Sequence, residues 1–172
     1  MSWIVVDVEA DGPVPGLYSM ISFAAIIVDK DLNKTFKAFT CPISEKWDSL
    51  ALHISCASRD EHLQYPHPAN AMRQFVIWLK ENSKGHPVFI SDNLAFDWQF
   101  INYYFHSFIG KNPFGFSGRR IGDLYCGLVK DAFAKWKHLR DTEHTHDPLD
   151  DVRGNAEVIL KMKDMGLNVP KI

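Results

Sequence analysis

The chain has 172 residues, of which 46% are hydrophobic and 23% are charged, and its formal net charge is −2. These values are typical of one globular domain, 1–172, that is long enough to bury a full core. They argue against a protein that grips duplex nucleic acid through positive charge alone, but not against an enzyme that holds a few nucleotides through metal ions.

The sequence contains no recognisable leader and no membrane segment. Its N-terminus lacks a basic region before an apolar run, and no stretch approaches the roughly 18 apolar residues of a membrane span. The three cysteines, Cys41, Cys56 and Cys126, are far apart and form no CxxC pair. They indicate reduced thiols in the core, so we expect a cytoplasmic protein that makes no membrane contact.

The first predicted strand ends in two acids. Residues 3–6 read Trp-Ile-Val-Val, and a Gly-Pro-rich turn follows at 11–16. Because side chains at positions i and i+2 of a strand point the same way, Asp7 and Glu9 would project in parallel, roughly 7 Å apart along the backbone. Two such carboxylates repel each other unless a cation compensates. Both could instead lie in a solvated turn, and this segment alone leaves the two alternatives open.

The rest of the chain reads as a strand meander followed by alternating helices and strands. A turn at 30–33 would join the second and third strands, and an irregular stretch with short helical turns occupies 44–66. This order predicts an α/β fold with a mixed central sheet, helices on both faces and the first strand in the centre. The further elements that we expect are strands at 18–29, 34–42 and 86–91 and helices at 67–85, 92–110, 122–139 and 146–166.

A third acid stands near the start of the helix expected at 92–110. Asp97 would lie on its first turn, directly after a strand, where metal ligands from separate segments can converge. The ordinary alternative is that Asp92, Asn93 and Asp97 only cap this helix and complement its dipole. Phe96 fits the apolar face of the same helix, so core packing is its default role.

The last candidate segment surrounds the start of the C-terminal helix. Asp147 as N-cap and Pro148 at the first helical position predict that start. His146 would then lie in the preceding loop and Asp151 on the first turn. His144 and His146 could form a zinc pair, but the sequence has no third histidine or cysteine at ligand spacing.

Taken in order, these fragments resemble the three motifs of the DEDDh 3′–5′ exonucleases, which belong to the RNase H-like (DnaQ-like) superfamily. The resemblance extends from residue 4 to about residue 165. The chain departs from many members at Ala10 and Asp11, where a threonine and a glycine-rich turn are common, and at Asp92, where histidine is common. The matching motifs are Asp7-x-Glu9, Asn93-x-x-Phe96-Asp97 and His146-x4-Asp151.

The resemblance implies an RNase H-like fold and a metal-dependent exonuclease. Such an enzyme hydrolyses single-stranded DNA or RNA from the 3′ end and releases nucleoside 5′-monophosphates. It would use two divalent cations, Mg²⁺ or Mn²⁺, which suits hard oxygen ligands and two-ion phosphodiester chemistry. The implied metal ligands are Asp7, which would bridge both ions, and Glu9, Asp97 and Asp151.

The resemblance also assigns the other site residues. His146 would be the general base, because imidazole titrates near neutral pH and a loop position lets it reach an attacking water. The terminal nucleotide would contact Ala10, Met20, Asn93 and Phe96. Several relatives are dimers, which leaves a homodimer open.

Other functions remain open at this point. The chain could be a non-cleaving nucleic-acid- or metal-binding module of the same fold. Within enzymes, it could be a phosphatase or nuclease of the RNase H type, which needs no equivalent of His146. Lys130, Lys137 and Arg140 could share a helical face beside a phosphate backbone, although such charges more often belong to a solvated face.

Overall fold

A five-stranded mixed sheet in the order β3–β2–β1–β4–β5 forms the centre of the protein. The computed structural model describes residues 1–55 and 57–170. β1 pairs antiparallel with β2 and parallel with β4, so the chain meanders on one side of β1 and crosses over on the other. The strands are β1 (Ser2–Ala10), β2 (Met20–Ile27), β3 (Thr35–Phe39), β4 (Pro87–Ser91) and β5 (Gly118–Arg120).

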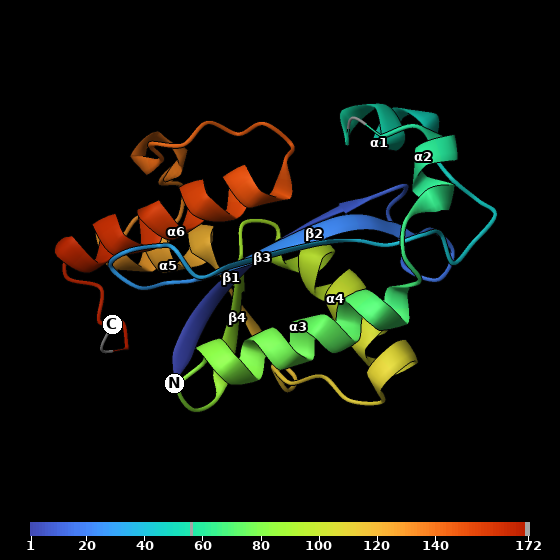
Figure 1. Ribbon diagram of the computed structural model, residues 1–172. Coiled ribbons are helices and arrows are strands. Elements are labelled where there is room, and N and C mark those ends of the chain that lie inside the picture. The colour runs from blue at the N-terminus through green and yellow to red at the C-terminus, as the bar shows by residue number, and fades with distance from the viewer. Residues whose placement is uncertain (56, 171–172) are drawn as a thin grey trace.

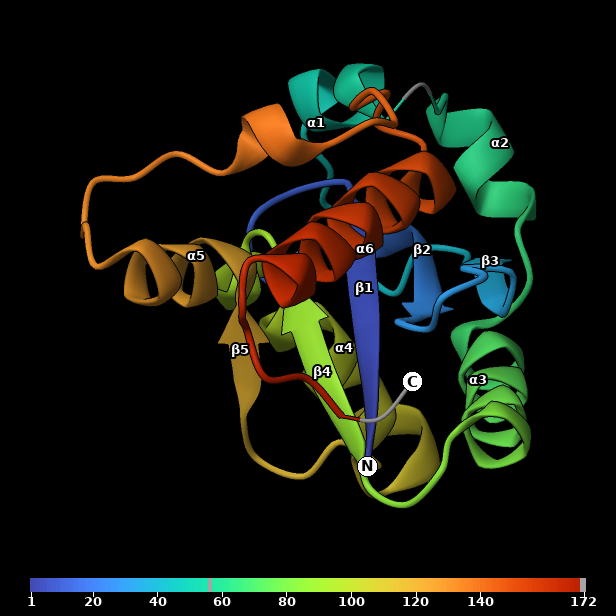
Figure 2. The ribbon, with the colours of Figure 1, turned by 90° about the vertical axis from the view of Figure 1, so that its left-hand side faces the viewer.

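Helices cover both faces of this sheet. One core lies between the sheet and helices α3 and α4, and a second lies between the sheet and helices α5 and α6 (Figures 1 and 2). This arrangement confirms the predicted α/β fold with the first strand in the middle. The helices are α1 (Ser49–Ile54), α2 (Arg59–Gln64), α3 (Pro68–Asn82), α4 (Leu94–Ile109), α5 (Ile121–Val129), the 3₁₀ turn η1 (Lys137–Leu139) and α6 (Pro148–Asp164).

The alternation of side chains along β1 decides where its acids point. Even-numbered residues of β1 face the core under α3 and α4, whereas odd-numbered residues face the core under α5 and α6. Asp7 and Glu9 continue the odd series, so both carboxylates lie on the α6 side of the sheet. The core residues of the two series are Ile4, Val6 and Val8 and, on the other face, Trp3 and Val5.

β1 loses one of its two neighbours halfway along its length. Its pairing with β4 ends at Val5, which lies opposite Ile90, whereas its pairing with β2 continues to Ala10 with a bulge between Glu9 and Ala10. The backbone of β1 beyond Val5 is therefore open on the β4 side. Side chains from other elements can reach it there.

Two local expectations were wrong. The helix expected at 122–139 ends at Val129, because Lys130 adopts a left-handed conformation (φ 59°) and its N–H donates to the carbonyl of Cys126. A loop over 130–136 follows, so Lys130, Lys137 and Arg140 share no helical face. The short strand β5 was not expected.

The burial of the cysteines and the character of the helices can be compared with the expected core thiols and absent membrane segment. Cys41 and Cys126 are free thiols, but they are only partly buried and so are not core residues. Cys56 lies outside the described residues. Within the described ranges, no helix has both the length and the apolar character needed to cross a bilayer.

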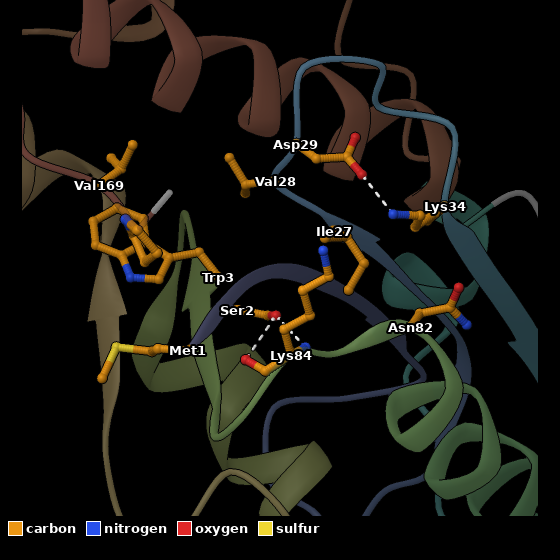
Figure 3. A pocket seen from close by; sticks show the side chains of 11 residues that line it. Met1, Ser2, Trp3, Ile27, Val28, Asp29, Lys34, Asn82, Lys84 and Val169 are labelled. Atoms are coloured by element: carbon orange, nitrogen blue, oxygen red, sulfur yellow. Dashed lines mark hydrogen bonds and ion pairs between the residues drawn. The ribbon is translucent and has the colours of Figure 1, made fainter. Parts of the chain in front are cut away.

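A small cavity of about 80 Å³ lies at the amino end of β1, opposite the end that carries the acids (Figure 3). The Ser2 hydroxyl accepts a hydrogen bond from the N–H of Lys84 (2.7 Å) and donates one to its carbonyl (3.3 Å). Asp29 and Lys34 form an ion pair beside it (3.1 Å). These contacts fix the start of β1, and the candidate site lies at its other end.

Candidate active site

Carboxylates from three elements meet near the end of β1. Oxygen atoms of Asp7, Glu9 and Asp151 lie within 4.8 Å of one another. Asp97 extends from the first turn of α4 to the open side of β1, where its Oδ1 accepts a hydrogen bond from the N–H of Val8 (3.1 Å). The structure thus brings together all four acids that the sequence singled out.

Two of these acids are almost completely buried with an unpaired oxygen. Asp97 is 2% exposed and Asp151 is 1% exposed, and Oδ2 of each has no hydrogen-bond partner among the described residues. A buried carboxylate oxygen without a partner is costly unless a cation is nearby. The alternative was that Asp92, Asn93 and Asp97 only cap α4 and complement its dipole. Asp97 does lie in the first turn, but the Asn93 side chain makes no capping bond and Asp97 accepts a hydrogen bond from β1, so capping alone does not account for Asp97.

Burial and mutual repulsion hold the pKa values of these carboxyls high. Burial raises the pKa of Asp7 well above its usual range, and the charges of Asp97 and Asp151 raise it further. Burial likewise raises the pKa of Glu9 to about 7 and that of Asp97 to about 8, although hydrogen bonds to each carboxylate act in the opposite direction. A cluster of this kind is stabilised by added positive charge.

Arg140, which was expected to share a helical face with Lys130 and Lys137, supplies part of that positive charge. Arg140 Nη2 lies 2.9 Å from Asp151 Oδ1, and its side chain is buried. Its charge also lowers the pKa of Asp7. Gly154, one turn after Asp151, leaves the space for it, since a Cβ there would lie 2.5 Å from Arg140 Nε.

His146 of the third motif and the neighbouring His144 both face the cluster. His144 Nδ1 lies 2.6 Å from Asp151 Oδ1, whereas His146 Nδ1 lies 3.9 Å from Glu9 Oε1. His146 has a left-handed backbone (φ 60°), a side chain that is 45% exposed, and no hydrogen bond to any residue that the structure describes. His144 was not expected in the site, and its contact with Asp151 supplies the third ligand that the zinc-pair alternative lacked.

The loop that carries these histidines is fastened to α6. Glu157 accepts hydrogen bonds from the N–H groups of Asp141 (3.1 Å) and Thr142 (2.9 Å) and from the Thr142 hydroxyl (2.7 Å). Lys161 pairs with Asp141 (2.6 Å). The loop, residues 140–147, therefore moves with the helix that carries Asp151.

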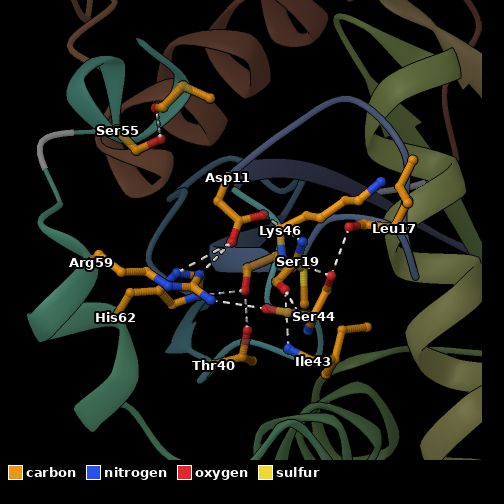
Figure 4. A network of polar contacts seen from close by, with 12 residues as sticks. Asp11, Leu17, Ser19, Thr40, Ile43, Ser44, Lys46, Ser55, Arg59 and His62 are labelled. Atoms are coloured by element: carbon orange, nitrogen blue, oxygen red, sulfur yellow. Dashed lines mark hydrogen bonds and ion pairs between the residues drawn. The ribbon is translucent and has the colours of Figure 1, made fainter. Parts of the chain in front are cut away.

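A second polar network, centred on Asp11, supports the site from the other side (Figure 4). The buried Asp11 carboxylate accepts a hydrogen bond from the N–H of Ser19 (2.5 Å) and pairs with Arg59 of α2 (2.9 Å). His62 Nδ1 lies 3.6 Å from the same carboxylate, and burial lowers the pKa of His62 to about 4. Arg59 also donates to the carbonyl of Ser44 (2.9 Å).

This network fixes the segment that covers Glu9. The N–H of Asp48, which caps α1, donates to the carbonyl of Asp11 (2.7 Å), and Ser55 at the other end of α1 donates from its hydroxyl to Glu9 Oε2 (3.2 Å). The departure from common family members at Asp11 thus has a structural role: it anchors α1 and α2 beside the site.

The four residues expected to contact a nucleotide differ in their surroundings. Asn93 is exposed, and Phe96 is partly buried with its ring 5.1 Å from that of Phe100. Ala10 and Met20 are buried in the core under α3 and α4, which does not fit the expected contact of their side chains with a base. The N–H of Met20 donates instead to the Tyr104 hydroxyl (2.7 Å).

A groove of about 200 Å³ adjoins His146. Its walls include Phe39 and Tyr65, whose ring centroids are 4.8 Å apart, and Lys37, whose ammonium pairs with Asp147 at 2.6 Å. The groove connects the histidine loop with the outer edge of the sheet.

The residues of the cluster fit divalent cations. Four carboxylates supply hard oxygen ligands, and two of them hold buried oxygens without a partner. Asp7, Glu9, Asp97 and Asp151 are the residues that would hold such ions. Phosphodiester hydrolysis with an attacking water is the chemistry that two divalent ions and an adjacent imidazole support.

Comparison with known proteins points to the same chemistry. The chain is 36% identical over 169 residues to the 3′–5′ DNA exonuclease Cap18 of Escherichia coli, and the match covers 91% of this chain and 88% of that protein. A scan against models of known protein families finds no match.

Solved structures share the fold. The nuclease domain of 3′hExo, a DEDDh family member bound to rAMP, superposes with a TM-score of 0.79 at 18% identity, over 96% of this chain and 92% of that one. E. coli exonuclease I in its zinc-bound complex with single-stranded DNA gives a TM-score of 0.70 at 18% identity. The match to exonuclease I covers 94% of this chain but only 39% of the larger protein.

Proposed function

The chain belongs to the DEDDh-type 3′–5′ exonucleases, and from this premise we propose that it removes nucleoside 5′-monophosphates from the 3′ end of single-stranded DNA with the help of two Mg²⁺ or Mn²⁺ ions. The observation that carries the proposal is the convergence of four carboxylates and His146, with unpaired buried oxygens on Asp97 and Asp151. We propose DNA rather than RNA as the substrate, because the E. coli relative is a DNA exonuclease.

Asp7, Glu9, Asp97 and Asp151 would hold the ions. When bound, the ions neutralise the phosphate, activate a water and stabilise the leaving oxygen. Burial supports this role, because a carboxylate that has little access to water gains more from a cation than an exposed one does. Arg140 provides positive charge at Asp151 from the protein itself.

His146 would accept the proton of the attacking water. Its ring is half-exposed, lies at the edge of the carboxylate cluster and packs edge-to-face against the His144 ring, with 4.3 Å between the ring centroids. It makes no hydrogen bond to the described residues, so no such bond has to break before it contacts the attacking water. His144 is held by Asp151 at 2.6 Å and serves better as a positioning residue for that carboxylate. Asn93 and Phe96, at the start of α4, would contact the terminal nucleotide.

Three further properties are part of the proposal. Residues 1–172 would act as one domain, because both cores share the same sheet. A cytoplasmic location is supported by the free thiols Cys41 and Cys126. The proposal of a homodimer is supported by the family resemblance alone. Analytical ultracentrifugation at several protein concentrations measures the oligomeric state.

The test is a nuclease assay with short single-stranded DNA and RNA, labelled at either the 5′ or the 3′ end. With Mg²⁺ or Mn²⁺, 5′-labelled DNA should shorten stepwise while 3′-labelled DNA releases a labelled mononucleotide at once. EDTA should abolish both. Release of internal fragments, or equal activity in EDTA, would contradict the proposal, and faster cleavage of RNA would reassign the substrate.

A further inference from the structure

Loop 130–136 exposes an aromatic ring to solvent and has several backbone contacts of its own. Phe133 is 91% exposed, yet its N–H donates to Asp131 Oδ1 (2.9 Å). The Cys126 thiol contacts the carbonyls of Ala132 and Ala134, each at 3.5 Å. The ring is therefore displayed by a fixed backbone.

The same loop borders a hollow of about 410 Å³, within the size range of clefts that hold small ligands. Phe133 lines it together with three basic side chains, Arg120, Lys135 and Lys137, and one acid, Asp123. Arg120 pairs with Asp123 (3.1 Å) and Lys137 pairs with Asp92, so Lys135 is the lining cation that makes no ion pair with the described residues.

The hollow is joined to the proposed nucleotide site through the loop after β4. Lys137 pairs with the Asp92 carboxylate (3.0 Å), and Arg120 Nε donates to the Asp92 carbonyl (3.3 Å). Asp92 directly precedes Asn93. Because β4 is parallel to β1 and β5 is parallel to β4, Asp92 and Arg120 lie at the end of the sheet where β1 carries its acids. In Figure 2 the segment between α5 and η1 arches outward beyond α5.

The hollow and the groove beside His146 differ in their aromatic ring and in one lysine. In the groove the Phe39 ring packs against Tyr65 and the ammonium of Lys37 pairs with Asp147. In the hollow Arg120 and Lys137 are likewise paired, with Asp123 and Asp92, but among the described residues Phe133 and Lys135 are not. Around loop 130–136, Lys135 is exposed and makes no ion pair with the described residues, and Phe133 has no ring partner among them.

We propose that this hollow binds the part of a single-stranded DNA that lies upstream of the nucleotide being removed. Phe133 stacks on a base, and Lys135 contacts a phosphate. Aromatic stacking combined with cations is how proteins bind single strands without reading their sequence. The proposal rests on the proposed exonuclease function and extends it to substrate length.

The experiment compares Phe133→Ala with Phe116→Ala. Phe116 lies just before β5, whereas the hollow lies at the other end of that strand. Phe116 is 97% exposed and Phe133 is 91% exposed, so neither substitution removes core packing. Steady-state kinetics are measured on a 12-nucleotide and a 2-nucleotide DNA. Binding of the 12-mer is measured by fluorescence anisotropy with Asp97→Asn as the inactive background.

Phe133→Ala should raise KM for the 12-mer, and weaken its binding, by roughly tenfold to hundredfold. Cleavage of the dinucleotide and every value for Phe116→Ala should stay unchanged. Lys135→Ala should reduce the slope of the logarithm of the 12-mer binding constant against the logarithm of the salt concentration, by the amount expected for about one phosphate contact. Phe133→Trp should retain tight binding.

The proposal is overturned if Phe133→Ala binds and cleaves the 12-mer as Phe116→Ala does, which would leave the ring for a protein partner. It is also overturned if Phe133→Ala loses equally on both lengths. Should the wild-type chain cleave neither DNA, the exonuclease function itself fails, and this result is separate because binding is measured independently.

Discussion

At the scale of single residues, two histidines two positions apart have different surroundings, and we propose different roles for them. His144 contacts the buried Asp151 carboxylate, whereas His146 lies beside Glu9 and packs against the His144 ring. A residue that orients a metal ligand affects metal affinity, and a general base affects the chemical step. The two roles separate in kinetics.

His146→Ala should lower kcat by about 10²–10⁴-fold at saturating Mg²⁺ or Mn²⁺, because proton transfer is lost while the carboxylates remain. His144→Ala should instead raise the metal concentration for half-maximal rate by about 10–100-fold. The sequence alone would make His144 a neutral control. His138, exposed in η1, takes that place, and His138→Ala should behave as wild type. Loss of kcat in His144→Ala alone would exchange the two roles.

Asp97 offers a residue-scale prediction about stability. Asn at this position keeps an oxygen to accept the Val8 N–H and removes a buried charge. The pKa of Asp97 is raised to about 8, so its contribution to stability is full below its unfolded value, about 3.8, and is lost as pH rises through about 8.

In metal-free buffer at pH 8, Asp97→Asn should therefore melt at a higher temperature than wild type, and the difference should shrink toward pH 5. Thermal unfolding at several pH values measures this. The variant should also be inactive. A lower melting temperature at pH 8 would show that the amide breaks more contacts than the charge removal relieves.

At the scale of elements, α6 and the loop before it form one unit. Arg140 and Glu157 tie the histidine loop to the helix, and Gly154 gives the Arg140 guanidinium its place. A methyl group at residue 154 would occupy that place, since it would lie 2.6 Å from Arg140 Nη2.

Gly154→Ala should displace Arg140 and leave Asp151 buried without its cation. We expect a loss of about 3 kcal/mol, or roughly 6–12 °C in Tm, in metal-free buffer and a smaller loss with Mg²⁺. Gly127→Ala in α5 is the matched control, because a Cβ there meets no atom within 4 Å. It should gain about 0.5–1 kcal/mol. Equal stabilisation of both variants would mean that Arg140 moves aside freely.

The limits of sequence reasoning are clearest at the scale of elements. β5 has only three residues, Gly118–Arg120, with no apolar alternation, and it is a strand because the edge of β4 provides its partners. The sequence of residues 122–139 is compatible with a helix throughout, but the left-handed conformation of Lys130 ends the helix at Val129. No glycine stands at that position, so the sequence does not predict the end. Neither the pairing of β5 with β4 nor the conformation of one lysine leaves a periodic pattern in the sequence.

The site was predictable where motif spacing coincides with element ends. Asp147 and Pro148 mark the start of α6, which fixes Asp151 on its first turn. Arg140 could not be placed, because its partner lies on a different element and nothing local distinguishes it from a solvated arginine. The anchoring role of Asp11 depends on Arg59 and His62, far along the chain, and was missed for the same reason.

At the scale of the whole molecule, the acids make stability depend jointly on metal and pH. The pKa values of Glu9, about 7, and Asp97, about 8, exceed their unfolded values of about 4.5 and 3.8. Without metal, both groups therefore favour the folded state at low pH and lose that contribution as pH rises to about 8. Metal binding requires the ionised forms.

The rise in melting temperature on adding Mg²⁺ or Mn²⁺ should accordingly be small at pH 5.5 and larger at pH 8. Calorimetry near pH 6.5 in two buffers of different ionisation enthalpy should show proton release on binding. A metal effect that is independent of pH, with no proton release, would show that the carboxyls are already ionised.

The wide separation of Asp151 from Asp7 in the sequence has a consequence for folding. Asp151, on the helix that covers one face of the sheet, follows Asp7 and Glu9 by more than 140 residues. Until α6 docks, Asp7 and Glu9 lack their third neighbour, and His146 lacks the loop that places it. Domains fold as units once enough of the chain has emerged. A chain in which α6 has not docked therefore has no assembled carboxylate cluster, and we expect hydrolysis to begin only when folding is complete.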